Sequence, residues 1–222
     1  MSISSSRCHV SMTKWTPGEF LLDADALAAP LDLPAIFGND RPVELEIGCG
    51  KGTFILARAS ARPELNLLGI EWAKAYAIYT ADRARRAGCE SIRMLRTDAG
   101  AFVRDFVPDS SIWRVHVYFP DPWPKRRHRR RRLIQPGFVH EVRRILQPGG
   151  QFLMVTDHFD YFQQMRNVME AYRDGFVPVR FPSFTGDEGE LVGTNFERKY
   201  IAQGRPFFSA AFLRAGGNRQ AR

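Results

Sequence analysis

From residue 43 onward, short apolar runs alternate with amphipathic segments, and this alternation is the feature that most constrains the fold. Several runs carry apolar residues at successive positions, which is typical of strands buried on both faces of a parallel sheet. The runs cover 43–47, 66–70, 91–96, 112–119 and 151–156. We predict a doubly wound α/β fold with a mostly parallel sheet, which binds its ligands at the carboxyl ends of the strands.

Helical patterns separate these runs. The predicted helices cover 53–61, 73–87, 99–106, 136–146 and 159–172. Two further apolar runs, 176–181 and 207–214, flank a polar, glycine-bearing stretch, and we expect them to form an antiparallel strand pair that completes the sheet. The domain organisation we predict is an N-terminal extension (1–40), weakly structured and partly disordered because prolines interrupt it, then one folded domain (41–214) and a loose tail (215–222).

The positive charge of the chain is concentrated in one place. The 222 residues carry 32 Lys and Arg against 24 Asp and Glu, a net charge of +8. Residues 125–132, KRRHRRRR, hold seven of these cations, so eight minus seven leaves the rest of the chain only +1. This basic segment predicts a polyanionic partner such as a nucleic acid. A solvated surface run or a sorting signal is the alternative.

Several classes of protein are disfavoured by composition. No apolar run approaches the roughly 20 residues that a membrane span needs. The first residues, MSISSS, lack the basic-then-apolar order of a signal peptide. Three cysteines without paired spacing argue against a disulfide framework and against a cysteine zinc site. We therefore expect a cytoplasmic protein that binds neither a membrane nor a metal.

A glycine-rich turn follows the first predicted strand of the domain. The sequence ELEIGCGKG at 44–52 has the form G-x-G-x-G, which permits a tight turn and a close approach of the backbone to a ligand. Glu71 follows the next strand, where a carboxylate can bind the hydroxyls of a ribose. Gly48, Gly50 and Glu71 together predict a site for a nucleoside cofactor.

Three more acids stand where later strands end. Asp98 follows the third strand, and its alternative role is the N-cap of the next helix. Asp121 lies in FPDPWPK (119–125), where three prolines surround one acid and Trp123 in a rigid loop. Asp157 follows the fifth strand. Because the carboxyl ends of parallel strands meet at one edge of the sheet, these acids should face one crevice.

Together these motifs resemble the bacterial tRNA (guanine-N7-)-methyltransferase family of class I S-adenosylmethionine-dependent methyltransferases. The resemblance covers about 43–213, and its most specific element is FPDPWPKRRHRRRR. The other matching motifs, in chain order, are LEIGCGKG, LGIE, TDA, TD and TNFERK. The basic segment departs from the family only where Arg129 and Arg130 replace mixed polar and Lys residues. Residues 1–40 share nothing with the family.

The resemblance implies a Rossmann-like methyltransferase fold, S-adenosylmethionine as cofactor, and methylation of N7 of a guanosine at nucleotide 46 of the tRNA variable loop. By matching position, cofactor contacts fall on Glu46, Glu71, Asp98 and Asp121. Substrate contacts fall on Lys125, Asp157, Thr194, Asn195, Phe196 and Glu197. The RNA-contacting residues are Arg127, His128, Arg129, Arg130, Arg131 and Arg132. Whether the protein is a monomer or a homodimer stays open.

This reaction needs no general base, because guanine N7 carries a lone pair and no proton. Holding the reactants in line is the main catalytic device, and a carboxylate can stabilise the positive charge that develops on the base. Asp121 and Asp157 are the candidates, with Asp121 as the catalytic residue. Trp123 either stacks on the base or braces the loop, and His116 is expected to be a satisfied core histidine rather than a base.

Two other functions compete with this one. The first is methylation of an exocyclic amine of a nucleic acid. Such enzymes carry a D/N-P-P-[YFW] turn, whereas PDPW here displaces the aromatic residue by one position. The second is a non-catalytic RNA-binding module, which has no use for four acids at strand ends because acids repel phosphate.

Overall fold

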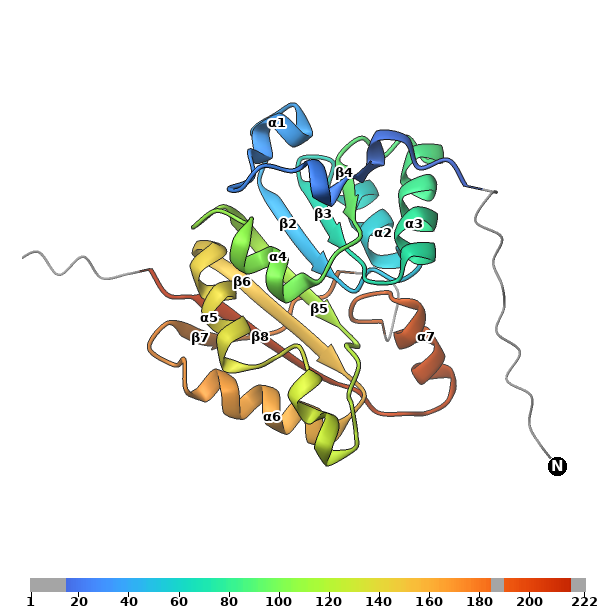
Figure 1. Cartoon of the computed structure of the whole chain (residues 1–222). Coiled ribbons are helices and arrows are strands. Elements are labelled where there is room, and N and C mark those ends of the chain that lie inside the picture. Colours follow the sequence, from blue (N-terminus) through green and yellow to red (C-terminus); the bar gives the residue numbers. More distant parts are fainter. Residues whose placement is uncertain (1–14, 185–189, 217–222) are drawn as a thin grey trace, which may run out of the picture.

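The computed structural model describes residues 15–184 and 190–216, and it is built around one eight-stranded sheet (Figure 1). The strand order is β1-β4-β3-β2-β5-β6-β8-β7. All neighbours are parallel except the β6–β8 and β7–β8 pairs, which are antiparallel. The strands are β1 (Leu21–Leu22), β2 (Val43–Ile47), β3 (Asn66–Ile70), β4 (Ile92–Leu95), β5 (Ile112–Tyr118), β6 (Leu146–Thr156), β7 (Phe176–Val179) and β8 (Phe208–Arg214). The predicted fold class is confirmed.

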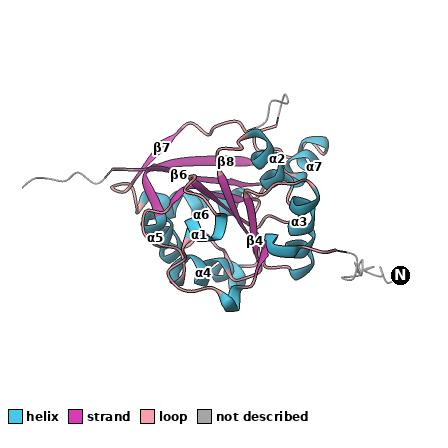
Figure 2. Ribbon diagram, turned by 90° about the horizontal axis from the view of Figure 1, so that it is seen from above, coloured by secondary structure: helices cyan, strands magenta, loops and turns pink. Residues whose placement is uncertain are grey.

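Helices cover both faces of this sheet (Figures 1 and 2). They are α1 (Leu33–Phe37), α2 (Thr53–Ala61), α3 (Lys74–Arg86), α4 (Ala99–Asp105), α5 (Pro136–Ile145), α6 (Phe159–Glu170) and α7 (Asn195–Ala202). Short 3-10 turns lie at η2 (Gly18–Phe20), η3 (Ala24–Ala26) and η4 (Arg126–Arg131). Apolar residues of α4, α5 and α6 pack on one face, and those of α2 and α3 pack on the other. None of the helices in the described part of the chain is both long and apolar enough to cross a membrane.

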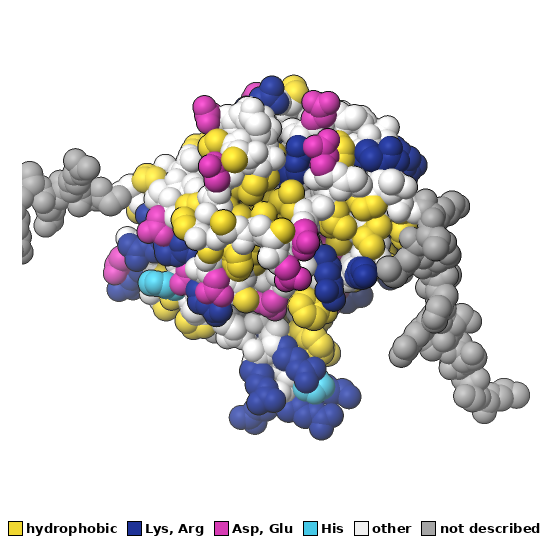
Figure 3. All heavy atoms as spheres, turned by 45° about the horizontal axis from the view of Figure 1, so that its top comes forward, with side chains coloured by type: hydrophobic (Ala, Val, Ile, Leu, Met, Phe, Trp, Pro, Cys, Tyr) yellow, Lys and Arg dark blue, Asp and Glu magenta, His cyan; other side chains and the backbone are white. Residues whose placement is uncertain are grey.

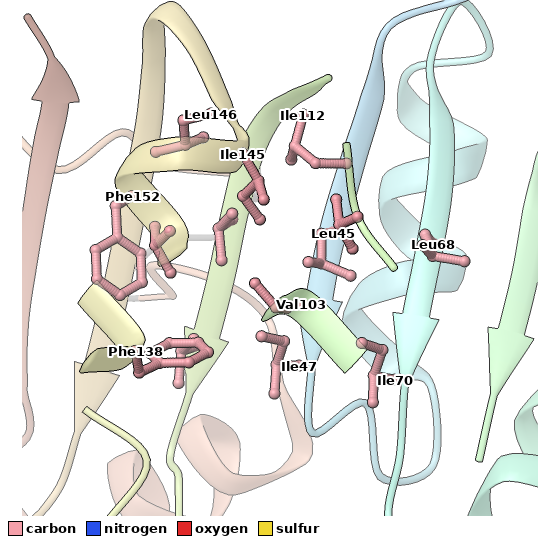
Figure 4. Packing of buried hydrophobic residues seen from close by; sticks show 14 of the residues in the cluster. Leu45, Ile47, Leu68, Ile70, Val103, Ile112, Phe138, Ile145, Leu146 and Phe152 are labelled. Atoms are coloured by element: carbon pink, nitrogen blue, oxygen red, sulfur yellow. The ribbon is translucent and has the colours of Figure 1, made fainter. Parts of the chain in front are cut away.

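The main core lies between the sheet and the α4–α6 layer. Leu45 and Ile47 of β2 point into it, and Val103 of α4 and Phe138 of α5 belong to the same cluster (Figure 4). All four are less than 9% exposed. The alternate positions of β2 point to the opposite face, so the period of two in this strand places Leu45 and Ile47 in the core and Glu44 and Glu46 beneath it.

The N-terminal segment is more ordered than its prolines predict. β1 pairs in parallel with β4 at the edge of the sheet, and Asp32 caps α1 by accepting a hydrogen bond from the backbone N–H of Ala35. Four of its side chains are buried: Phe20, Leu31, Leu33 and Phe37. Residues 15–40 therefore form an integral part of the domain. Residues 1–14 of the predicted extension, and 217–222 of the predicted tail, lie outside the described residues.

The C-terminal part contains the expected antiparallel strands, with one addition. α7 stands between β7 and β8 and begins in the TNFERK motif. Thr194 caps it by accepting a hydrogen bond from the backbone N–H of Glu197 at 3.1 Å. The segment is mostly polar, so the spacing of its few apolar residues did not predict this helix.

A buried ionic cluster lies under the sheet on the α2 side. Glu44 is fully buried and binds the Arg58 guanidinium through two hydrogen bonds of 2.8 and 2.7 Å. Arg114 and His116 contact the same carboxylate, each at 3.1 Å. His116 is therefore a buried, partnered histidine, as predicted. Although burial raises the pKa of Glu44, the hydrogen bonds from Arg58 and His116 outweigh it and hold the pKa well below its usual range.

We predict that Glu44→Ala destabilises the protein by about 3–5 kcal/mol, because it leaves buried cations without their anion. Urea unfolding gives the free energy. Glu64→Ala is the matched control, because Glu64 forms an exposed pair with Arg62, and its free energy of unfolding should equal that of the wild type within error. Equal losses of unfolding free energy in the two variants would show that the buried cluster stabilises the protein no more than the exposed pair does.

Candidate active site

The loops that follow β2, β3, β4 and β5 line one cleft of about 730 Å³. Its wall includes nine residues that the sequence pointed to: Gly48, Gly50, Glu71, Asp98, Asp121, Trp123, Arg131, Arg132 and Phe196. A second cavity of about 390 Å³ adjoins it and is lined by Glu46, Thr194, Asn195 and Lys199, among others. Both cavities share Gly48, Gly50, Tyr76, Tyr118, Phe119 and Phe196. Three of the four acids expected to face one crevice therefore line the cleft, whereas Asp157 lines neither cavity.

The glycine loop leaves its backbone open to a ligand. Gly48 and Gly50 have φ angles of +84° and +52°, which residues with a side chain rarely adopt. A Cβ added to either would meet no atom within 4 Å, so the backbone borders open space. The Glu71 carboxylate accepts one hydrogen bond on each oxygen, from the N–H of Gly50 and of Ala73, both at 2.8 Å. It retains lone pairs for two hydroxyl donors, so the donor set fits a nucleoside ribose.

Asp98 caps a helix and also borders the cleft. Its Oδ1 accepts a hydrogen bond of 2.8 Å from the N–H of Ala101 and caps α4. The side chain is also exposed and lines the cleft. The N-cap bond fixes the carboxylate at the rim, where it can accept a further hydrogen bond from a ligand.

Glu46 lies beneath the glycine loop and borders the second cavity. It is 3% exposed, and its Oε2 has no hydrogen-bond partner among the described residues. Burial raises the pKa of this carboxyl to about 8, and the negative charge of Glu71 acts in the same direction. A buried carboxyl with one unpartnered oxygen beside a cavity is a natural partner for a cationic group of a ligand.

The loop that carries Asp121 is held in an unusual conformation. Phe119 and Trp123 are non-glycine residues with φ angles of +52° and +41°. The Arg131 guanidinium lies 5.0 Å from the centre of the Trp123 ring, and His128 packs edge-on against that ring at 5.9 Å. Asp121 is exposed, and its carboxylate makes no hydrogen bond or ion pair with any residue in 15–184 or 190–216. It is free to bind a ligand.

The predicted substrate residues occupy different environments. Thr194, Asn195 and Phe196 line the second cavity, and Lys125 is exposed. Asp157 is paired with Arg205 at 2.5 Å.

Glu197 is fully buried and points into the chain rather than the cavity. Its carboxylate accepts hydrogen bonds from the N–H groups of Leu191, Val192 and Gly193. In this structure Glu197 holds the loop before α7 in place through these hydrogen bonds and is not available to bind a ligand.

The basic segment projects from the body of the molecule. η4 forms the turn at the lower edge of Figure 1, and Lys and Arg side chains gather with one His on the same projection in Figure 3. Arg126, Arg127 and Arg130 are exposed. Arg132, predicted to contact RNA, is instead buried, with its guanidinium bound to protein groups. Arg129 is half exposed and pairs with Asp160 at 2.9 Å.

Sequence patterns missed several residues that line the cavities, Tyr76 and Tyr118 among them. Tyr118 lines both cavities, and its hydroxyl lies 2.7 Å from Nδ1 of His116, whose Nε2 contacts Glu44. It reads as an ordinary strand aromatic, and only its position two residues before Pro120 signals that it borders the ligand loop. Among the described residues, no cluster of three or more His, Cys, Asp or Glu side chains could hold a metal ion.

A parallel sheet of this strand order with an antiparallel C-terminal pair, a glycine loop and acids after successive strands defines a class I S-adenosylmethionine-dependent methyltransferase. Solved structures agree on the fold. A 30S ribosomal A1408 methyltransferase from an uncultured bacterium has a TM-score of 0.55 at 13% identity, covering 82% of this chain and 92% of that one. An S-adenosylmethionine-dependent methyltransferase from Aquifex aeolicus has a TM-score of 0.54 at 11% identity, covering 78% and 82%.

Sequence comparison identifies a family within this class of methyltransferases. A family model described as "Putative methyltransferase" matches residues 40–210. The tRNA (guanine-N(7)-)-methyltransferase of Geobacter metallireducens is 35% identical over 85% of this chain and 90% of that protein. The protein of the same name from Myxococcus xanthus is 40% identical over 83% and 89%. The chain belongs to the tRNA (guanine-N7-)-methyltransferase family.

We predict that Glu46 releases its proton when S-adenosylmethionine binds. A carboxyl with a pKa of about 8 is mostly protonated at pH 7, and a nearby cation favours its ionised form. Cofactor affinity should therefore rise as the pH increases towards 8 and level off above it.

Calorimetry at pH 7 in two buffers of different ionisation enthalpy measures the release, which we expect to be close to one proton. Glu46→Gln should abolish the release and weaken binding. The same proton count in both proteins would remove Glu46 from the cofactor site.

Proposed function

We propose that this protein transfers the methyl group of S-adenosylmethionine to N7 of a guanosine in tRNA, at nucleotide 46 of the variable loop. The observation that carries this proposal is the placement of Asp121, a free carboxylate on the wall of the cofactor cleft, four residues before a projecting basic segment. The names of the sequence relatives support the substrate and the atom methylated.

The chain's contribution to this reaction is binding and orientation. When bound, the cofactor supplies a methyl group already activated by its sulfonium. Guanine N7 is unprotonated at neutral pH, so no residue has to remove a proton. The basic segment holds RNA phosphates, and Phe196 and Trp123 offer aromatic faces on which an unstacked base can pack. Holding the two reactants in line accounts for most of the rate gain.

Carboxylates act on the charge that forms. The guanine ring becomes positive as N7 is methylated, and Asp121 stabilises this charge because no protein group competes for its oxygens. Asp157 suits the N1–H and N2 amine edge of guanine, since one carboxylate can accept both hydrogen bonds. Arg205 must first leave Asp157; its own side chain is about half exposed, so it has room to move.

A methyl-transfer assay tests the function directly. The protein is incubated with tRNA lacking 7-methylguanosine and with labelled S-adenosylmethionine, and the digested nucleosides are separated. We expect label only in 7-methylguanosine, and none in a transcript whose guanosine 46 is replaced by adenosine. Label in a base methylated on its exocyclic amine would favour the other enzyme class, and tRNA binding without any label would favour a binding module.

We predict that Asp121→Ala lowers kcat by about 10²–10³, the usual effect of losing one preorganised electrostatic contact, while the protein stays folded. Asp40→Ala is the matched control, because Asp40 is an exposed acid that precedes β2 at the opposite edge of the sheet. Its kcat should equal that of the wild type. Near wild-type turnover in a folded Asp121→Ala protein would remove Asp121 from the mechanism.

A further inference from the structure

Arg132 differs from the rest of the basic segment in its burial. Its side chain has no exposed surface, whereas that of Arg129, three residues earlier, is 46% exposed. A fully buried guanidinium does not reach an RNA phosphate unless the protein around it opens. Its positive charge must therefore act inside the protein.

Each nitrogen of the Arg132 side chain has an acceptor. Nε donates to the backbone carbonyl of Pro122 at 2.8 Å. Nη1 donates to Oε1 of Gln164 at 2.8 Å, and Nη2 to Oδ2 of Asp160 at 2.6 Å. The guanidinium carbon also lies 4.8 Å from the centre of the Tyr161 ring. Three acceptors in these directions use the planar fork of arginine, which lysine cannot reproduce.

The acceptors belong to two separate parts of the fold. Pro122 is the neighbour of Asp121 in the loop after β5, whereas Asp160, Tyr161 and Gln164 lie on α6. Hydrogen bonds at both ends of Ile134 fix this part of the helix. Its N–H donates to the Tyr161 hydroxyl, and its carbonyl accepts from Gln164 Nε2, both at 3.0 Å. Arg132 thus connects a rigid helix to the loop that carries Asp121.

The loop needs such an external tie. Phe119 and Trp123 hold left-handed φ angles that cost free energy, and surrounding contacts must maintain them. Prolines at 120, 122 and 124 have no N–H, so the loop has few hydrogen bonds of its own. The Arg132–Pro122 bond supplies one from outside, next to the carboxylate whose position matters.

We propose that Arg132 is a positioning residue, which ties the Asp121 loop to α6 and sets the place of the Asp121 carboxylate, and that it is not a phosphate contact. Its effect on turnover rests on the proposed function, but its effect on the loop does not. The basic segment is therefore divided: its exposed arginines bind the polyanion, and its last arginine organises the active site.

Four variants separate charge from geometry. Arg132→Gln removes the charge and the fork, and Arg132→Lys keeps the charge but loses the fork. Arg130→Gln removes an exposed charge from the same segment. Arg173→Gln, at the end of α6, is the control for loss of a surface cation, because Arg173 is 75% exposed.

The first measurement is tRNA methylation at several salt concentrations, at a temperature where each variant is folded. Both Arg132 variants should lose about tenfold to a hundredfold in kcat, because a small misplacement has that effect, with an unchanged tRNA salt slope. Arg130→Gln should instead raise the KM for tRNA and make the slope of log K against log salt shallower by roughly 0.7–0.9. Arg173→Gln should match the wild type in kcat, in the KM for tRNA and in the salt slope.

The second measurement needs neither tRNA nor activity. Hydrogen exchange of the backbone N–H groups in 119–135 should be at least tenfold faster in Arg132→Lys than in the wild type, and unchanged in Arg130→Gln. Gln164→Ala keeps Arg132 but removes one of its acceptors on α6 together with the bond to the Ile134 carbonyl, so its exchange is compared over 119–124, where it should give a smaller change of the same kind. Gln164→Ala takes the place of Arg132→Gln in the comparison if Arg132→Gln does not fold.

Two results would overturn the proposal. One is full kcat in Arg132→Lys together with a shallower salt slope in Arg132→Gln, the pattern of a phosphate contact. The other is wild-type exchange of 119–135 in Arg132→Lys together with wild-type exchange of 119–124 in Gln164→Ala. If the wild type methylates no tRNA, the proposed function fails, yet the exchange experiment still decides whether Arg132 holds the loop.

Discussion

The Glu71 carboxylate holds together the part of the structure on which the site depends. It accepts hydrogen bonds from the N–H of Gly50 in the loop after β2 and from that of Ala73 at the start of α3. These bonds fix the glycine loop, whose positive φ angles leave its backbone facing open space. A half-buried carboxylate that satisfies two N–H groups also limits how the loops can move. The cleft therefore exists before any ligand binds.

The sheet was predictable because its central strands are buried on both faces. β2 and β3 have the predicted limits. β3 is apolar on both faces apart from Asn66, whereas β2 alternates Glu44 and Glu46 with apolar residues, which is the period of a strand. The N-terminal elements were not predictable in this way. β1 has two residues and α1 has five, too few to show a period, and packing of Phe20 and Phe37 against the domain orders them.

The site was predictable in position but not in side-chain contacts. Strand topology alone brings Glu71, Asp98 and Asp121 to one edge, so their convergence followed from the sequence. The direction of a side chain depends on partners that are distant in the chain. Arg132 turns inward because Asp160 and Gln164 lie 28 and 32 residues away, and Glu197 turns inward because a loop offers it three N–H groups. Neither a run of charged residues nor a short motif reveals these distant partners.

The opposed charges around the Asp121 loop restrict how RNA can approach. The cleft wall carries the carboxylates of Glu71, Asp98 and Asp121, which repel phosphate, although Arg131 and Arg132 also border it. The exposed cations Arg126, Arg127 and Arg130 stand outside it on η4. On the proposed function, the RNA backbone therefore stays at the basic segment while only a base enters the cleft. Such a base has to leave its stack, which costs least in an irregular loop of the RNA. Asp121 and Arg126 are five residues apart in the chain, so a loop held at Pro122 limits how far the basic segment can move relative to the Asp121 carboxylate.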